Sequence, residues 1–323
     1  MTFIGKLKKL KRKVDGDFIP FLKMLFYNII CKGYIKLFGK RDKRKLKYKI
    51  SFCLIFKDEA PFLKEWLDFH LTVGVDHFYL YNNNSDDNFR EVLEPYIEQE
   101  TVTLIEWPEQ NSQFKAYKHC FETYRNETNW ISFIDADEFM VPKYVNSIGE
   151  WLSKYDKYPA VMIHWLIFGT GGQLEHDYSR LVIEQYHTCW DTLYPYGKCF
   201  VNTRFEISRF DLWHLHHHTH MKYPLMGIKI TLPAINQFDH ICCATKTWGH
   251  ESIEKSSLLC NHYYTKAWDR YHWKMNRTDV LFSDAPRKKM GQFYKMEDKC
   301  VSCNYTISKY LIRLKINQGE IKL

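Results

Sequence analysis

The chain of 323 residues is 45% hydrophobic and 26% charged, a composition typical of a globular protein with a substantial core. Its net charge of +8 is uneven, because residues 1–50 hold 16 Lys and Arg against three acids, or +13, which leaves −5 for the remainder. Such a segment indicates an anionic partner, membrane lipid or nucleic acid, for one arm alone. The ten cysteines lack the spacing of a small disulfide scaffold, so reduced thiols in a cytoplasmic setting are expected.

Residues 1–49 are predicted to form a basic, amphipathic arm. Apolar residues recur at helical spacing from Phe18 to Ile30, and the helix is expected to end near Gly33. The apolar stretch is shorter than the ~20 residues that cross a bilayer, and its charged lead is too long for a signal peptide. Two interpretations stay open: a helix lying in the plane of an anionic membrane, on its inner, cytoplasmic face, or a helix that docks on the folded domain.

From Ile50 the sequence alternates between strand and helix patterns. Strands are expected at 51–56, 77–81, 101–105, 130–134 and 160–165, with helices from Pro61 to near Gly74, up to Glu94, from Ser112 to Tyr124 and after Ser147. Repeated βα units of this length predict an α/β fold with a doubly wound, mainly parallel sheet. No GxGxxG or GxxxxGK[ST] motif is present, which disfavours a dinucleotide or P-loop site.

The stretch from Trp130 to Pro142, WISFIDADEFMVP, joins a strand pattern to three acids. Its apolar run stops at Asp135, as in a buried strand that delivers carboxylates to its C-terminal end. Residues two apart on a strand point the same way, so Asp135 and Asp137 are expected to converge while Glu138 points away. Two such carboxylates suit Mg²⁺ or Mn²⁺, with water and phosphate oxygens completing the shell. The alternative is an acidic turn that only caps the strand.

Further distinctive blocks flank this stretch in order. They are Lys57-Asp58-Glu59, Glu65-Trp66, Phe69-His70, the run Gly74 to Tyr79, Asn84-Ser85, Asp87, Trp165, Phe168-Gly169, Lys198, Asn261-His262-Tyr263 and Lys266. Together with Trp130 to Phe139 they resemble glycosyltransferase family 92, nucleotide-sugar enzymes of the GT-A fold. Three places depart from the family: its Lys-Asn-Glu, Lys-Ser and Arg-Gly are Lys57-Asp58-Glu59, Lys266-Ala267 and Arg277-Thr278 here.

The resemblance implies a GT-A type domain at 50–280, with a nucleotide-binding half at 50–165 and an irregular acceptor half at 166–280. A basic tail at 281–323 would follow. It also implies a metal-dependent, inverting transfer of a hexose from a nucleotide sugar, in the first place a UDP-sugar, to a glycan. The basic arm adds the expectation of a lipid-linked acceptor, such as lipopolysaccharide, at an anionic membrane.

The resemblance also assigns candidate site residues. Asp135 and Asp137 would hold Mn²⁺ or Mg²⁺ with His262 as a third ligand, and the metal would offset the charge of a diphosphate leaving group, to which Lys266 would also bind. The nucleotide sugar is expected to contact Asp135 and residues at the ends of the first two strands, namely Phe56, Lys57, Glu59, Asn82, Asn84 and Asp87. The alternative for the polar residues among them is turn geometry alone.

An inverting transfer needs a base that deprotonates the acceptor hydroxyl. Glu175 and Asp177 follow the glycine loop 169–172 and are the best-placed carboxylates in sequence order, while Asp191 and His217 are rivals. His217 lies among His214, His216, His218 and His220, which would share the opposite face of an extended strand. Because no Cys or carboxylate lies among these histidines, we predict that they line the acceptor-binding side of the site rather than bind a metal.

Two other functions compete with this one. The basic arm with aromatic stacking suits a nucleic-acid-binding protein, but the remainder carries −5 and has no RNA-binding motif, so no nucleic-acid partner is expected. A catalytically inactive GT-A domain that binds glycans is the other alternative, and the intact acids Asp135, Asp137 and Glu138 argue against it.

Overall fold

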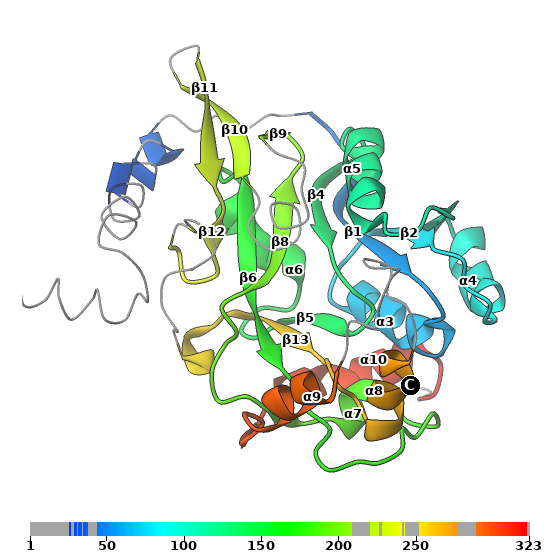
Figure 1. Ribbon diagram of the computed structural model, residues 1–323. Helices are drawn as coiled ribbons and strands as arrows, with labels where there is room; N and C mark the ends of the chain where they lie inside the picture. Colours follow the sequence, from blue (N-terminus) through cyan, green and yellow to red (C-terminus); the bar gives the residue numbers. More distant parts are fainter. Residues whose placement is uncertain are drawn as a thin grey trace, which may run out of the picture.

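A computed structural model of the chain (Figure 1) describes residues 44–208, 220–225, 228–240, 242, 252–276 and 289–321. In the N-terminal arm it describes residues 26, 29–30, 32–33 and 35–37. The predictions for His214, His216, His217 and His218, and for most of the arm, therefore lie outside the described residues.

The described elements alternate between strands and helices. The strands are β1 (Tyr48–Phe56), β2 (His77–Asn82), β3 (Val102–Glu106), β4 (Thr128–Phe133), β5 (Glu138–Pro142), β6 (Ala160–Ile167), β7 (Thr188–Cys189), β8 (Gly197–Asn202), β9 (Glu206–Ile207), β10 (His220–Leu225), β11 (Ile228–Pro233), β12 (Ile235–Asn236), β13 (Leu258–His262) and β14 (Ser302–Cys303). The α-helices are α3 (Ala60–Thr72), α4 (Phe89–Glu98), α5 (Gln113–Tyr124), α6 (Ile148–Leu152), α7 (Val182–Gln185), α8 (Trp268–Met275), α9 (Met290–Glu297) and α10 (Leu311–Asn317). Short 3₁₀ turns are η1 (Ser153–Tyr155), η3 (Ile253–Lys255) and η4 (Thr306–Tyr310).

One large sheet organises the described residues, with strand order β3-β2-β1-β4-β8-β6-β13-β5 and β12 beside β6. Strands β1 to β4 pair in parallel, β8 is antiparallel to β4 and β6, and β13 is parallel to β6 but antiparallel to β5. The C-terminal ends of β1, β2, β4 and β13 therefore point to the same edge. In open α/β sheets, ligands bind just outside such an edge.

Helices cover both faces of this sheet (Figure 1). Phe52 and Leu54 of β1 pack with Trp66 of α3, whereas Cys53 packs on the other face with Tyr117 of α5, as expected for side chains that alternate along a strand. Burying each large apolar side chain contributes about 1.5–3 kcal/mol, so two helical layers hold the sheet edge in place. The predicted α/β class with a doubly wound, mainly parallel sheet is confirmed.

Local sequence accounts for several element boundaries. Ser147 caps α6 as predicted, because its hydroxyl accepts the backbone N–H of Glu150 at 3.1 Å. Pro61 lies in the first turn of α3, where its missing N–H leaves no bond unmade. Several predicted ends are wrong by one to four residues. Strand β4 stops at Phe133 rather than 134, α4 continues to Glu98 rather than 94, and the arm is still helical at residues 35–37, beyond Gly33.

The described part of the C-terminal segment packs on the domain. Helix α10 contacts α3, where the side-chain amide of Asn317 donates to Thr72 Oγ1 at 3.0 Å. The hydroxyl of Tyr310 donates to the carbonyl of Pro142 at the end of β5 at 2.8 Å. Among the described residues, no helix has the length and apolar character needed to cross a membrane.

Candidate functional site

The acidic stretch forms a tight turn between β4 and β5. The backbone N–H of Glu138 donates to the carbonyl of Asp135 at 3.1 Å, and Glu138 Oε2 accepts the backbone N–H of Asp135 at 3.0 Å. Because the chain leaves the extended conformation after Phe133, the alternation of a strand does not apply here. The prediction that Glu138 points away from the other acids is therefore wrong, and its carboxylate lies buried beneath the turn.

A buried lysine joins two of these acids. Lys198, on β8 next to β4, places its Nζ 2.8 Å from Asp135 Oδ2 and 3.3 Å from Glu138 Oε2. Burial raises the pKa of Glu138 well above its ordinary value, and the neighbouring charges of Asp135 and Asp137 raise it further against the opposing effect of Lys198. Lys198 thus supplies a positive charge to both carboxylates from the strand next to β4.

Asp137 lies between a histidine and a second lysine. Its Oδ1 is 3.5 Å from Nε2 of His262, which ends β13, and its Oδ2 is 3.3 Å from Nζ of Lys274 on α8. Lys274 also lies 3.3 Å from Oε1 of Glu59. Although burial favours the neutral acid, Lys274, His262 and Lys266 hold the pKa of Asp137 well below its ordinary value. Asp137 therefore stays ionised in spite of its burial.

Two cationic side chains flank this group without using all their donors. Lys266 is 2% exposed, has a left-handed backbone at φ 53°, and holds its Nζ 4.3 Å from the ring of Phe62 with no hydrogen-bond partner. Burial, with Lys274 nearby, lowers the pKa of Lys266 to about 8. The guanidinium of Arg270 lies 5.0 Å from the same ring, and its Nε and Nη2 are likewise buried without partners. Because a buried unpaired donor costs about 1–3 kcal/mol, these groups suit an anion.

The spacing of Asp137 and His262 suits two ligands of one divalent cation. Two ligands with bonds of ~2.1 Å that meet at 90–120° lie about 3.0–3.6 Å apart. Asp137 Oδ1 and His262 Nε2, at 3.5 Å, match that spacing, and a carboxylate with an imidazole suits Mn²⁺. Across the described part of the chain no three His, Cys, Asp or Glu side chains converge on one point. The residues therefore fit a cation held by two protein ligands, with phosphate oxygens and water as the others.

The polar residues after β1 and β2 form two interlocked turns at the same edge. Asn82 donates to Glu106 Oε2 at 2.7 Å, and Asn84, with φ 57°, donates to the carbonyl of Pro108 at 2.9 Å. Asp87 accepts the backbone N–H of Ala60 at 2.8 Å at the start of α3. These contacts favour the alternative that the three residues only stabilise the turns. A contact with the nucleotide stays a prediction for them.

Other predicted donor contacts lie at the end of β1. Phe56 is buried, and its ring centroid is 5.4 Å from that of Phe89. Lys57 follows it and is half-buried. The side chain of Glu59 is 14% exposed, and the lysines 274 and 266 hold its pKa below the ordinary value against the effect of desolvation. Of these residues predicted to bind the nucleotide sugar, Glu59 lies near Asp137, because Lys274 contacts both carboxylates.

The candidate bases differ in their surroundings. Glu175, Asp177 and Asp191 are exposed, and Asp177 accepts both the hydroxyl and the backbone N–H of Ser179, which hold its pKa below the ordinary value. Between the first two lies His176, which the sequence argument passed over. It is 7% exposed, its Nδ1 is 2.8 Å from the hydroxyl of Tyr186, and burial lowers its pKa to about 4. A neutral imidazole beside Phe62 makes His176 a further candidate.

Arg270 and Lys274 were not predicted as site residues, and Lys198 was predicted only as part of the family resemblance, without a role. A signal for the first two was present, because Lys266, Arg270 and Lys274 recur every four residues. In the structure α8 begins at Trp268, so Arg270 and Lys274 are neighbours on one helical face. No comparable signal marks Lys198, whose partners are brought to it by the pairing of β4 with β8.

The chain is similar in sequence to proteins of one enzyme family. The sequence profile of glycosyltransferase family 92 matches residues 48–292. The family 92 protein At1g27200 of Arabidopsis thaliana is 25% identical over 242 residues, which cover 74% of this chain but only 39% of that protein. Galactan beta-1,4-galactosyltransferase GALS3 of the same plant is 29% identical over 132 residues, 36% of this chain and 26% of the relative.

Among solved structures, residues 1–349 of S. aureus TarS align with a TM-score of 0.34 and 10% identity, over 48% of this chain and 47% of that one. This likeness is too slight to support an argument about the site. The profile match, in contrast, covers the acidic turn, β8, β13 and α8, and so contains every charged group described above.

Proposed function

The chain belongs to glycosyltransferase family 92, and we propose that it is a metal-dependent, inverting glycosyltransferase that moves a hexose from a nucleotide sugar to a glycan. The observation that carries the proposal is the Asp137–His262 pair, which lies beside three cationic side chains at the sheet edge where parallel strands end. The named galactosyltransferase relative supports a hexose as the transferred group.

The donor is proposed to be a UDP-sugar, whose diphosphate carries the charge that the site is arranged to meet. The unpartnered Nζ of Lys266 and the Nε and Nη2 of Arg270 would donate to its oxygens, and the ring of Phe62 holds both cations in position. The base and ribose would lie along the ends of β1 and β2, near Phe56 and Lys57.

The cation is proposed to be Mn²⁺ or Mg²⁺, with Asp137 and His262 as ligands and Asp135 within the same turn. When bound, such an ion supplies positive charge to the diphosphate leaving group. Lys198 would keep Asp135 oriented through its 2.8 Å contact, and Lys274 would do the same for Asp137. These lysines also limit the negative charge of the turn in the free protein.

In the proposed reaction the acceptor hydroxyl oxygen forms a bond to the anomeric carbon as the bond from that carbon to the diphosphate oxygen breaks. The hydroxyl proton passes to a base, for which the described candidates are Glu175, His176, Asp177 and Asp191. The diphosphate leaves with the electron pair of the broken bond and is met by Lys266 and Arg270. Inversion follows because attack and departure occur on opposite faces of the sugar.

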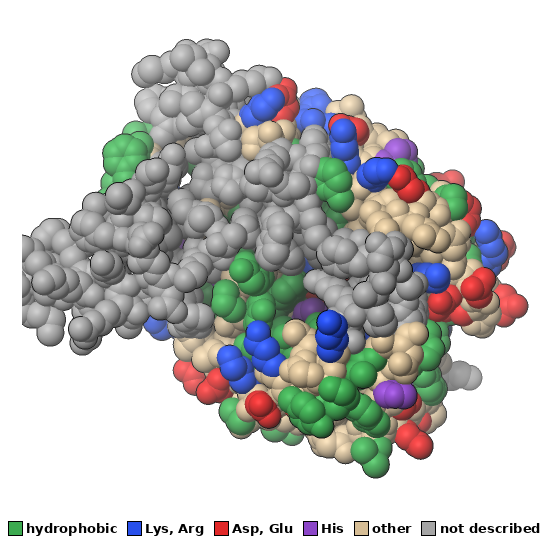
Figure 2. All heavy atoms as spheres, viewed as in Figure 1, with side chains coloured by type: hydrophobic (Ala, Val, Ile, Leu, Met, Phe, Trp, Pro, Cys, Tyr) green, Lys and Arg blue, Asp and Glu red, His purple; other side chains and the backbone are tan. Residues whose placement is uncertain are grey.

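The acceptor is proposed to be a glycan, such as a lipid-linked saccharide of the lipopolysaccharide type. Tyr178 and Trp273 are 58% and 37% exposed, and Arg270 joins them, through a hydrogen bond of 3.2 Å to Tyr178 and a stacking contact of 4.4 Å with Trp273. Figure 2 shows hydrophobic side chains gathered on the lower part of the visible face, over α8 and α9, with basic side chains at their border. Aromatic faces of this kind suit the apolar faces of sugar rings.

A catalytically inactive glycan-binding module is the second candidate. It is favoured by the ammonium groups of Lys198 and Lys274, which contact carboxylate oxygens that a metal ligand set would use. The two proposals differ in one measurement, since only the first requires that Mn²⁺ strengthens UDP binding.

The test is a panel of nucleotide sugars incubated with Mn²⁺, with hydrolysis or transfer as the readout. Asp137→Asn should lower turnover about 100-fold or more, because it removes one ligand charge from the site. Asp298→Asn, at an exposed position after α9, is the matched control and should turn over normally. Full turnover in Asp137→Asn would remove Asp137 from the metal site, and UDP binding without any turnover would favour the inactive module.

A further inference from the structure

One side of the described arm helix docks on the domain. Residues 26, 29–30, 32–33 and 35–37 are helical. Ile35 is 1% exposed, and the ammonium of Lys32 donates to the backbone carbonyl of Asp239, in the turn after β12. These contacts agree with the interpretation that the arm docks on the folded domain.

Four other described helical residues of the arm are apolar and exposed to solvent. The exposed fractions are 59% for Phe26, 69% for Ile29, 48% for Ile30 and 77% for Leu37. At 100° per residue these four side chains fall within about 100° of one another, and Ile35 lies opposite them. We call these four residues the apolar stripe. Neighbouring exposed apolar side chains of this kind are characteristic of a binding surface.

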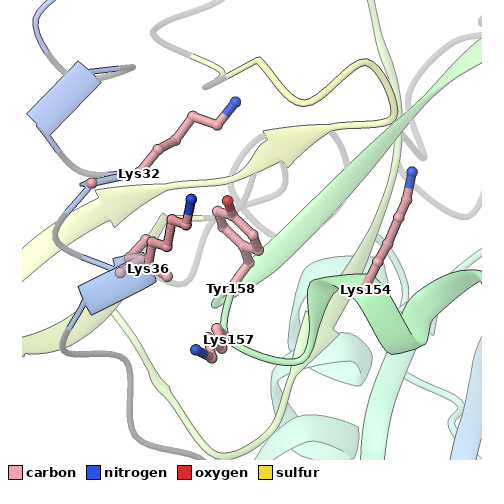
Figure 3. A pocket seen from close by; sticks show the side chains of 7 residues that line it. Lys32, Lys36, Lys154, Lys157 and Tyr158 are labelled. Carbon is pink, nitrogen blue, oxygen red and sulfur yellow. The ribbon is translucent and has the colours of Figure 1, made fainter.

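A basic pocket of about 310 Å³ opens beside this helix (Figure 3). Lys32 and Lys36 enter it from the arm, and Lys154, Lys157 and Tyr158 line it from η1 and the turn that follows. Figure 3 shows the ammonium of Lys36 beside the hydroxyl of Tyr158. The seven lining residues include four lysines and no acid. An anionic surface beside this pocket would give the lysines a counter-charge.

We propose that the apolar stripe and the lysine pocket form one surface that binds an anionic phospholipid membrane. The stripe would enter the boundary between headgroups and acyl chains, while Lys36, Lys154 and Lys157 contact lipid phosphates. Because Ile35 and Lys32 dock the helix, membrane binding requires no detachment of the arm from the domain. The inference does not depend on the transferase activity and goes beyond it.

The composition of the stripe distinguishes lipid from nucleic acid. Single-stranded nucleic acid is bound by aromatic side chains on which bases stack, but three of the four exposed side chains, Ile29, Ile30 and Leu37, are aliphatic. Aliphatic side chains gain free energy by leaving water for a hydrocarbon boundary. The charge distribution agrees, because residues 1–50 carry +13 and the remainder −5, which would direct the arm toward an anionic surface.

The experiment measures flotation of the full chain with vesicles of phosphatidylcholine alone, or of phosphatidylcholine mixed with phosphatidylglycerol. Lys36→Gln/Lys154→Gln/Lys157→Gln should bind the mixed vesicles about 100-fold more weakly, because each lysine near such a surface contributes about fivefold. Lys64→Gln/Lys115→Gln/Lys118→Gln removes the same charge from exposed positions on α3 and α5 and should bind like the parent.

A second variant tests the stripe separately. Ile29→Ser/Leu37→Ser should still associate at low salt but should be released at high salt, because only screened electrostatic contacts remain. Equal flotation of the pocket variant and the control triple, or retention of the stripe variant at high salt, would overturn the proposal. So would binding of a single-stranded RNA that depends on the same lysines without binding to mixed vesicles. Thermal unfolding of each variant verifies that all are folded.

Discussion

Lys274→Met is the most informative single change in the site, because one ammonium group contacts two carboxylates that are largely shielded from solvent. Lys274 Nζ lies 3.3 Å from both Asp137 Oδ2 and Glu59 Oε1, and the three side chains are only 12–16% exposed. Methionine keeps most of the apolar stem of the lysine and removes the charge. The substitution therefore isolates the electrostatic contribution of the contact.

The expected loss follows from burial. Removal of one partner from a buried ion pair costs about 3–5 kcal/mol, and the partial exposure of these groups reduces this to about 2–4 kcal/mol in unfolding free energy at pH 7. Because the pKa of Asp137 is held below its unfolded value of about 3.9, its stabilisation is present above that pH and is lost as pH falls through the folded pKa. The difference in unfolding free energy between parent and variant should therefore become smaller at acidic pH.

Chemical denaturation of both proteins from pH 7 to pH 3 measures this gap. Lys295→Met, an exposed position on the neighbouring helix α9, is the control and should change the unfolding free energy by less than about 0.5 kcal/mol. A variant as stable as the parent at pH 7 would refute the argument. A gap that stays constant with pH would show that the loss arises from packing and not from the carboxylates.

Three further predictions follow from other parts of the structure. Lys266→Gln and Arg270→Gln should each weaken UDP binding about 10-fold in titration calorimetry, because each removes a charged hydrogen-bond donor worth ~1.5–3 kcal/mol. If both variants bound UDP as tightly as the parent, neither residue would belong to the diphosphate site. Burial raises the pKa of Glu65 to about 7, so the unfolding free energy of the parent should fall by up to about 3 kcal/mol as pH rises from about 4.5 to 7. In denaturant titrations, Glu65→Gln should lack this contribution to the pH dependence. Gly197→Ala should destabilise the fold by more than about 3 kcal/mol, because its Cβ would lie 1.7 Å from the carbonyl oxygen of Ile163. A soluble variant with unchanged melting temperature would contradict the packing at β8.

The periodicity of the first half of the domain predicted its elements closely. The short apolar run at 51–56 and the apolar positions of the following helix identified β1 and α3, and Ser147 marked the start of α6. These patterns are local, because a strand or helix face is buried or exposed as a unit. The same logic failed for Glu138, since it assumed that the strand continues through a turn.

The arm illustrates a different limit. Helical spacing in the sequence suited both docking and membrane binding, and nothing in one amphipathic pattern decides which side faces the domain. The structure assigns Ile35 to the docked side and leaves Phe26, Ile29 and Leu37 exposed. The docking interpretation therefore holds for Ile35, and it does not exclude membrane binding by the exposed residues, which stays a proposal.

Taken alone, the sequence determined the α/β class, the family and the place of the acidic residues at the end of a strand, because each depends on residues close together in the chain. The tertiary structure decided which charges meet. Lys198 comes to Asp135 from β8, and Lys274 comes to Asp137 from α8, across 63 and 137 residues of chain. Contacts between residues so far apart arise from strand pairing and helix packing, which no local pattern encodes.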